Sequence, residues 1–236
     1  MSLEHCDALI DKMEVALNEI SLVYSEPNET LITVSPSTKI DIKNFLENAN
    51  SVLDYLSFFI FEEYSKNILD ENTFAERADY VSFFYTKNKD NFLRNMNAAF
   101  PNLKESNPEI YSIFEIHQPW CAPDWRKNLH KLVNQNKHKN LSLQKNSEKY
   151  DIKYLNVPGL IKAESTTGLS MKNVYFNGTY YKDISDMKRK LNGNYQYTKI
   201  FMFTDLKEPV IEVLSNILKN EKKLIDHFEK IEISTN

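Results

Sequence analysis

The chain has 236 residues, enough for one large domain or two small ones with a substantial buried core. Hydrophobic residues make up 42% of it and charged residues 26%, values typical of a globular protein, which argues against extended disorder. The net charge of −4 argues against binding of nucleic acid through overall charge, but it leaves room for a local basic surface.

The two cysteines, Cys6 and Cys121, cannot form a disulfide framework, and neither belongs to a CxxC pair. We therefore expect a reducing, cytoplasmic compartment. Beside Trp120, Cys121 is expected to be a small buried side chain rather than a nucleophile next to His117. The N-terminus lacks the basic and apolar regions of a signal peptide, and no apolar run approaches the roughly 18 residues that cross a bilayer, so no membrane association is expected.

Helical periodicity dominates the first 140 residues, and glycine is absent from the first 158. The apolar spacing predicts helices at about residues 4–24, 37–66, 91–99 and 108–116, and a further helix from residue 124, whereas residues 72–84 show no clear pattern. The second helix is expected to be central, because it carries a continuous apolar stripe. Its members are Ile42, Phe45, Leu46, Ala49, Val52, Leu53, Leu56, Phe59 and Ile60.

The four glycines fall between Gly159 and Gly193, which indicates a region of turns. Asn177-Gly178 predicts a two-residue hairpin, and residues 200–204 predict a further strand. The aromatic side chains of the hairpin suit either a stacking platform for bases or packing against the helices; the lack of interleaved Arg favours packing. Pro209 then suits the first turn of a last helix. The buried stripe of that helix is expected to be Val210, Val213, Leu214, Ile217, Leu224, Ile225 and Phe228.

These elements predict an α+β protein, mainly a helical bundle with a small antiparallel β part and a C-terminal helix. We expect residues 1–236 to form a single compact unit. The bundle would occupy residues 1–140, and the β-rich part, at 141–205, would pack on or beside it. The C-terminal helix, at 206–232, would return to the bundle.

Positive charge is concentrated between Arg126 and Ser147, where six Lys or Arg and two His occur without any Asp or Glu. At 100° per residue, Arg126, His130, Asn134 and Lys137 share one polar face of a helix, and His138 lies at its edge. The core side of this helix is expected to consist of Trp125, Leu129, Leu132 and Val133.

Two interpretations of the cationic helix are open. In the first, His138 and His130 act as general acid and base, and Arg126, Lys137 and Asn134 bind an anion, which is the outline of metal-free RNA cleavage. The partner would then be RNA or another anionic ligand. In the second, the helix is a solvated cationic face packed against acidic neighbours, such as residues 41–79 with their nine acids and three bases.

No metal or cofactor is expected. His117, His130 and His138 are widely spaced and have no Cys or carboxylate pair close by in the sequence, whereas zinc sites usually show tight local pairs. The sequence also lacks a Gly-rich phosphate loop and the GxSxG and HExxH motifs.

Three segments carry a resemblance to a known family: Ser51-Val-Leu-Asp54, Gln118-Pro119-Trp120, and the helix from Leu129 to Lys139. Their order resembles a widespread bacterial family of helical proteins with a Ser-Ala-Leu-Asp segment, then Gln-Pro-Tyr, then a helix ending in Leu-Asn-x-x-Asp-Lys-His-Arg. The resemblance covers about residues 40–230. This chain has Asn136 in place of the Asp and Lys139 in place of the Arg, so the carboxylate of that constellation is missing.

A more distant resemblance is to the HEPN superfamily, which includes RNA-cutting toxins and defence proteins with an Arg-x(4–6)-His motif. Arg126 and His130 enclose only three residues, and the pair with the right gap, Lys131 and His138, begins with Lys. The resemblance implies a bacterial or phage-related helical bundle, homodimers, and a role directed at RNA or in defence. The alternative hypothesis is a non-catalytic interaction or structural protein in which residues 134–139 are a structural knot. Whether the chain is an enzyme stays open between the two.

Overall fold

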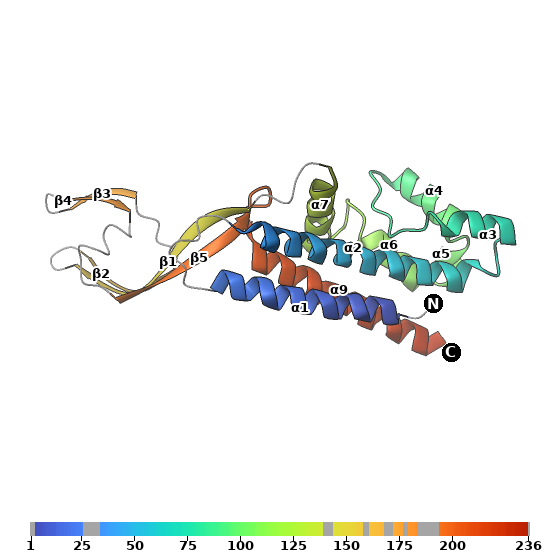
Figure 1. The fold of residues 1–236 in the computed structure, drawn as a ribbon. Helices are drawn as coiled ribbons and strands as arrows, with labels where there is room; N and C mark the ends of the chain where they lie inside the picture. The colour runs from blue at the N-terminus through green and yellow to red at the C-terminus, as the bar shows by residue number, and fades with distance from the viewer. Residues whose placement is uncertain are drawn as a thin grey trace.

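The computed structural model describes the backbone of residues 3–25, 34–138, 144–157, 161–167, 172–176, 179–183 and 194–235, and the side chains of residues 3–24, 34–136 and 201–231. A bundle of helices makes up most of the molecule, and an arm of antiparallel strands extends from one end of it (Figure 1). The predicted fold class is confirmed: the chain is mainly a helical bundle with a small antiparallel β part and a C-terminal helix.

Three long helices lie side by side: α1 (Glu4–Ser25), α2 (Pro36–Ser65) and α9 (Val210–Thr235) (Figure 1). The cationic helix, α7 (Asp124–His138), packs against both α2 and α9. Four shorter helices connect α2 to α7: α3 (Glu71–Ala78), α4 (Lys89–Ala99), α5 (Leu103–Ser106) and α6 (Pro108–Ile116).

The predicted apolar stripes form the core. Every member of the α2 stripe is fully buried except Phe59, which is partly buried, and all seven members of the α9 stripe are buried. The predicted core side of α7 is buried as well. Since burial of each large apolar side chain contributes about 1.5–3 kcal/mol, these stripes explain why the helices assemble.

Polar caps explain where four of the helices begin. Ser35, Asp70, Asn88 and Asn107 precede α2, α3, α4 and α6, and each side chain accepts a hydrogen bond from the backbone N–H three residues further on. Such a cap satisfies one of the unpaired N–H groups of a first helical turn and typically stabilises the helix by about 1 kcal/mol. The Asp70 cap marks α3, which hydrophobic periodicity did not predict.

The strands form two antiparallel groups. The first is a sheet with the order β2 (Ile161–Thr167), β1 (Gln144–Val157), β5 (Asn194–Phe203) and β6 (Glu208–Pro209). The second is the hairpin of β3 (Lys172–Phe176) and β4 (Thr179–Asp183). Phe176 pairs with Thr179, as the predicted two-residue hairpin requires. The turn residues Asn177 and Gly178 lie outside the described residues.

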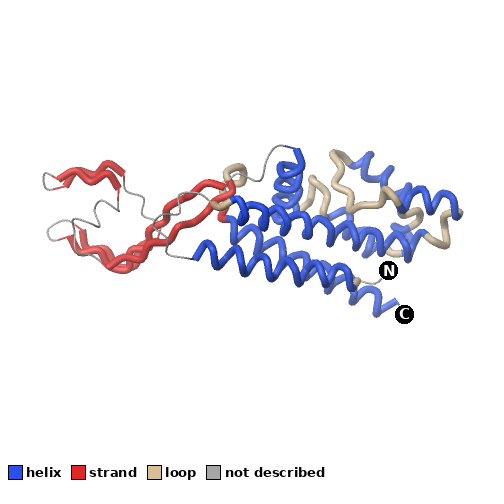
Figure 2. The backbone as a smooth tube through the Cα atoms, viewed as in Figure 1, coloured by secondary structure: helices blue, strands red, loops and turns tan. Residues whose placement is uncertain are grey.

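The arm contacts the bundle at its base. Phe201 and Phe203 of β5 are buried, and the ring of Tyr24 in α1 stacks on Phe201 at 4.6 Å. Beyond this base β1 and β5 pair with each other and continue past the end of the helices (Figure 2). We expected the whole β part to lie on or beside the bundle, and the strands reach further because β1, with 14 residues, spans roughly 46 Å.

The β3–β4 hairpin lies at the far end of the arm, so its predicted packing against the helices is not observed (Figure 1). Whether residues 1–236 form one compact unit stays a prediction. In the part of the chain that the structure describes, no helix combines the length and the apolar character needed to cross a bilayer.

Candidate functional site around residues 80–86

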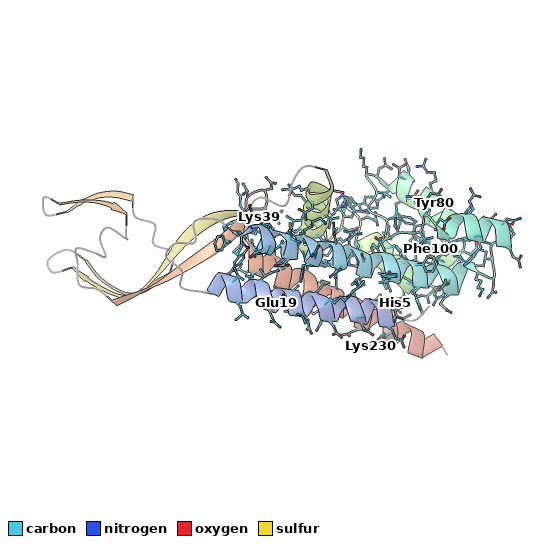
Figure 3. All side chains as sticks on the ribbon, in the orientation of Figure 1. His5, Glu19, Lys39, Tyr80, Phe100 and Lys230 are labelled. Atoms are coloured by element: carbon cyan, nitrogen blue, oxygen red, sulfur yellow. The ribbon has the colours of Figure 1, made fainter. Side chains whose placement is uncertain are left out.

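Residues 80–86 join α3 to α4 and run over the bundle without forming a helix or strand. Tyr80, at the start of this segment, lies in the half of the bundle that is remote from the β arm (Figure 3). Two side chains of α2 hold the backbone of the segment. The Oγ of Ser57 donates a hydrogen bond to the carbonyl oxygen of Ser82 at 3.0 Å, and Oδ1 of Asp54 accepts one from the N–H of Phe83 at 3.0 Å.

Gln118, two residues after the end of α6, holds the other half of the segment. Its side chain is 0% exposed, and its Nε2 donates to the carbonyl oxygens of Phe84 and Phe114, both at 2.8 Å. Its Oε1 accepts from the backbone N–H of Thr86 at 3.0 Å and lies 3.2 Å from the Thr86 hydroxyl. A largely half-buried irregular segment leaves its backbone polar groups without ladder partners, so these bonds supply what secondary structure would otherwise provide.

The third contact comes from α7, where Arg126 and His130 lie one turn apart and both meet Tyr85. The guanidinium carbon of Arg126 lies 4.8 Å from the centroid of the Tyr85 ring, and the His130 ring lies 3.9 Å from it. Arg126 also lies over the Phe83 ring at 5.8 Å. The face of α7 that carries these two residues is therefore covered by the 80–86 segment.

Residues from the three sequence segments that carried the family resemblance thus meet at one place. Asp54 comes from the first segment and Gln118 from the second, and His130 comes from the third. Each contacts residues 80–86 through a hydrogen bond or a ring contact. Their observed role in the fold is to fix an irregular segment on the bundle.

The prediction that Arg126 lies on the exposed polar face of α7 is wrong, because Arg126 is only 2% exposed. The helical-wheel argument assumed that α7 packs on one side, whereas Phe83 and Tyr85 cover a second side. The Nε and Nη1 atoms of Arg126 make no hydrogen bond among the described residues. A guanidinium buried in this way is not accessible to an anion in solution.

Glu221 of α9 is the acidic counterpart of Arg126 in the core. It is 0% exposed, and neither of its carboxylate oxygens has a hydrogen-bond partner in the described part of the chain. Burial raises the pKa of Glu221 well above its ordinary value, while the charge of Arg126 acts in the opposite direction. Burial also lowers the pKa of Arg126 to about 10, which leaves the guanidinium charged at neutral pH.

Sequence reasoning did not single out Glu221, although a signal was present. The residue lies four positions after Ile217 and three before Leu224, so a carboxylate interrupts the apolar stripe of the last helix. A charge at such a position predicts a buried opposite charge, which Arg126 supplies without a hydrogen bond to either carboxylate oxygen. Tyr85 was missed as well, because it follows directly on residues 72–84, which show no clear pattern, and belongs to no predicted helix.

The remaining predicted site residues are only partly brought together. His130 is half-buried and Asn134 is exposed; Nδ2 of Asn134 lies 2.9 Å from Nε2 of His130. Arg126 contacts the same Tyr85 ring as His130 but is buried. The side chains of Lys137 and His138 lie outside the described residues, so their predicted roles stay predictions.

The exposed side of α7 packs against the turn between β5 and β6. Nζ of Lys131 donates to the carbonyl oxygen of Asp205 at 2.8 Å, and the Gln135 amide donates to the carboxylate of Asp205 at 2.5 Å. The amide of Asn128 donates to Glu208 at 3.2 Å. The acidic neighbours of these exposed side chains come from residues 205–208 rather than from residues 41–79.

Cys121 and His117, the two other residues considered in the sequence, lie in and beside the turn that follows α6. Cys121 is exposed, so its predicted burial is wrong; its Sγ lies on the outer side of the turn that follows α6 and donates to the carbonyl oxygen of Glu115. His117 is 6% exposed, and its Nδ1 donates to the carbonyl oxygen of Ile113 at 2.6 Å. Its ring meets Phe83 and Trp125 edge to face, so it belongs to the packing beneath the segment.

His117 predicts an acid-sensitive contribution to stability. Burial lowers its pKa below the ordinary value, so folding favours the neutral ring. The contribution is present above the unfolded-state pKa of about 6.5 and is lost as the pH falls through the folded-state value. Urea unfolding between pH 7.5 and pH 5 should show a smaller loss of stability in His117→Phe than in the wild type. Equal losses in the two proteins would contradict this role.

Within the described ranges, no group of three or more His, Cys, Asp or Glu side chains is placed to hold a metal ion. The architecture is that of a helical bundle that holds an irregular segment in place and carries an extended β arm. Neither a protein-family model, nor a curated protein, nor a solved structure matches this chain.

Proposed function

We propose that this chain is a non-catalytic interaction protein with an HEPN-like helical bundle, in which the motif residues of α7 are structural. The observation that carries the proposal is the position of Arg126, which is 2% exposed and lies under Tyr85. A cation that stabilises a reacting phosphate must contact the phosphate, whereas the guanidinium of Arg126 is buried in the core.

Two other features of α7 support the same conclusion. The His130 ring contacts the Tyr85 ring at a centroid distance of 3.9 Å and an interplanar angle of 32°, which restricts the approach of a substrate on that side of the imidazole. The Nζ of Lys131 donates a hydrogen bond to the carbonyl oxygen of Asp205 at 2.8 Å. A binding protein needs only a rigid, shaped surface, and the hydrogen bonds to residues 80–86 provide one.

The wider setting of the proposal rests on the family resemblance. We place the protein in the cytoplasm of a bacterium, as a chain of bacterial or phage-related origin. A homodimer and a role in defence follow from the HEPN-like character. RNA or another anionic ligand is the partner that this resemblance implies.

A second candidate function is that of an HEPN-like, RNA-directed enzyme. It is favoured by the His130–Asn134 pair, in which an amide lies 2.9 Å from a half-buried imidazole on a cationic helix. In this version His130 or His138 moves the proton of an attacking 2′-hydroxyl, and Lys137 and Asn134 bind the phosphate. Arg126 takes no part in it.

An RNA-cleavage assay distinguishes the two candidates. Labelled single-stranded and structured RNAs are incubated with the wild type, His130→Ala, His138→Ala and the exposed control His227→Ala of α9. The non-catalytic proposal predicts no cleavage above the buffer level by any of the four proteins. Cleavage by the wild type and His227→Ala that is lost in His130→Ala or His138→Ala would establish the enzyme instead.

A further inference from the structure

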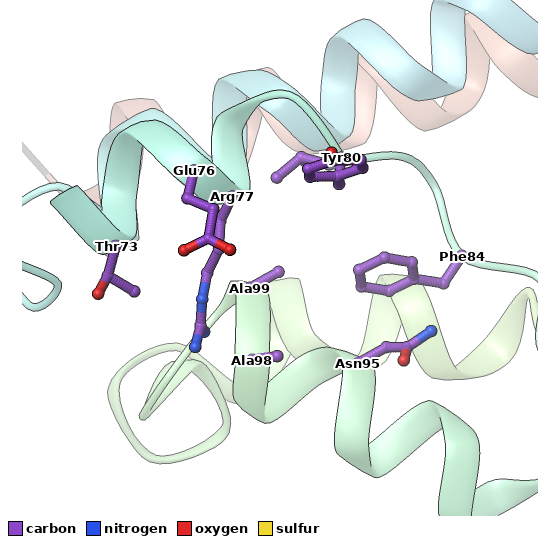
Figure 4. Close-up of a pocket in the computed structure, with 9 residues that line it drawn as sticks. Thr73, Glu76, Arg77, Tyr80, Phe84, Asn95, Ala98 and Ala99 are labelled. Carbon is purple, nitrogen blue, oxygen red and sulfur yellow. The ribbon is translucent and has the colours of Figure 1, made fainter.

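A pocket of about 420 Å³ lies beside the 80–86 segment, between α3 and α4 (Figure 4). It is distant in sequence from the cationic helix, and none of the predicted site residues lines it. Its walls come from three consecutive parts of the chain. The residues that matter are Glu76 and Arg77 of α3, Tyr80 and Phe84 of the segment, and Asn95, Ala98 and Ala99 of α4.

The floor of the pocket is held rigidly. The carbonyl oxygen of Phe84 accepts a hydrogen bond from Gln118, and the Phe84 ring packs on Phe100 at 6.1 Å. The carbonyl oxygen of Ala99 accepts a hydrogen bond from the Oγ of Ser65 at 2.7 Å. The Phe84 ring and the backbone at Ala99 are therefore fixed in place before any ligand arrives, which lowers the entropic cost of binding.

The rim offers unused recognition groups. Tyr80 is 80% exposed and its ring makes no aromatic contact with the described residues. Among the residues that the structure describes, the side chains of Glu76, Arg77 and Asn95 likewise have no hydrogen-bond or ion-pair partner. Figure 4 shows Glu76 and Arg77 on one side of the pocket and Tyr80 and Phe84 on the other.

We propose that this pocket binds a purine nucleoside 5′-phosphate, either free or as the 5′ end of an RNA. The rings of Tyr80 and Phe84 offer stacking surfaces to the base. The amide of Asn95 can both donate to and accept from the edge of a base. A purine is favoured because its two fused rings offer the larger stacking surface to Tyr80 and Phe84. Arg77 binds the phosphate through its planar guanidinium, and Glu76 accepts hydrogen bonds from the ribose hydroxyls.

The presence of one carboxylate and one guanidinium on the same wall favours this ligand class. A carboxylate beside the cation disfavours a polyanion, but it suits a molecule that carries hydroxyl donors next to a single phosphate. A volume of about 420 Å³ accommodates one nucleotide and leaves no room for a duplex. The inference goes beyond the proposed function, because different residues carry it and it does not depend on whether α7 is catalytic.

The test is isothermal titration calorimetry on the full chain with AMP, GMP and UMP. Two further ligands are short RNAs that begin with a purine, one with a 5′-phosphate and one with a 5′-hydroxyl. We expect AMP or GMP, or the 5′-phosphorylated RNA, to bind. Arg77→Gln and Tyr80→Ala should each weaken binding by about 10-fold. Arg94→Gln, which removes an exposed arginine of α4 outside the pocket, is the matched control and should bind like the wild type.

The outcomes separate the sources of the ligand. Tighter binding of the free purine nucleotide identifies a mononucleotide site, and tighter binding of the 5′-phosphorylated RNA identifies an RNA-end site. The proposal is overturned if none of the purine ligands binds, if UMP binds as tightly as AMP and GMP, or if Arg77→Gln behaves like Arg94→Gln. A cleavage-negative protein that binds AMP supports this inference and leaves the account of α7 intact.

Discussion

Replacing Arg126 with alanine is expected to lower the free energy of unfolding by about 3 kcal/mol. The substitution leaves the fully buried carboxylate of Glu221 without its opposite charge and removes the cation that lies under Tyr85. The loss falls at the lower end of the range for broken buried pairs, because Glu221 can take up a proton instead. Chemical denaturation at neutral pH measures it.

Matched variants separate charge from packing at this position. Lys127→Ala removes the neighbouring, exposed cation, whose contact with Asp124 is 3.9 Å, and should change stability by less than about 0.5 kcal/mol. The double variant Arg126→Met with Glu221→Leu should recover most of the stability, because an apolar pair of similar volume needs no compensation in the core. A double variant no more stable than Arg126→Ala would show that the two charges are not coupled.

Gln118→Met is expected to destabilise the bundle by roughly 3 kcal/mol, since a buried polar group left without a partner costs about 1–3 kcal/mol. Methionine fills the same space but leaves three backbone groups, at Phe84, Thr86 and Phe114, without their partner. The full sum of three such costs is not expected, because the segment can move outward and admit water. Thermal and urea unfolding both measure the effect.

Gln135→Met is the control for this substitution. The Gln135 amide, on the surface of α7, donates to the carboxylate of Asp205, and water can replace this bond when it is lost. We therefore expect the free energy of unfolding to change by less than about 1 kcal/mol. Similar losses in Gln118→Met and Gln135→Met would contradict the view that Gln118 holds the segment.

The three long helices, α4, α6 and α7 could be predicted from the sequence because their apolar spacing is a local signal, whereas α3 and α5 were not predicted. The stripes of α2 and α9 are buried as the periodicity indicated, and α6 begins at Pro108 after its Asn107 cap. The placement of the β arm could not be predicted in this way. Strand alternation predicts pairing, but it does not determine how far a ribbon extends beyond the elements that flank it.

The site was only partly predictable for a different reason. The segments that contain Asp54, Gln118 and His130 were visible in the sequence, but their common target, residues 80–86, was not, because this stretch forms no helix or strand. A helical wheel divides α7 into a core side and a solvent side, and it fails when an irregular segment covers the second side. This is why Arg126 was expected in solvent and is found in the core.

Backbone amide hydrogen exchange at Phe83 and Thr86 tests the central claim most directly. These two N–H groups belong to an irregular segment and are bonded to the side chains of Asp54 and Gln118 rather than to a helix or sheet. The structure predicts slow exchange at both positions in the wild type, with protection at Thr86 lost in Gln118→Met and kept in Gln135→Met. Fast exchange at Phe83 and Thr86 in the wild type would contradict the claim that the motif residues hold this segment on the bundle.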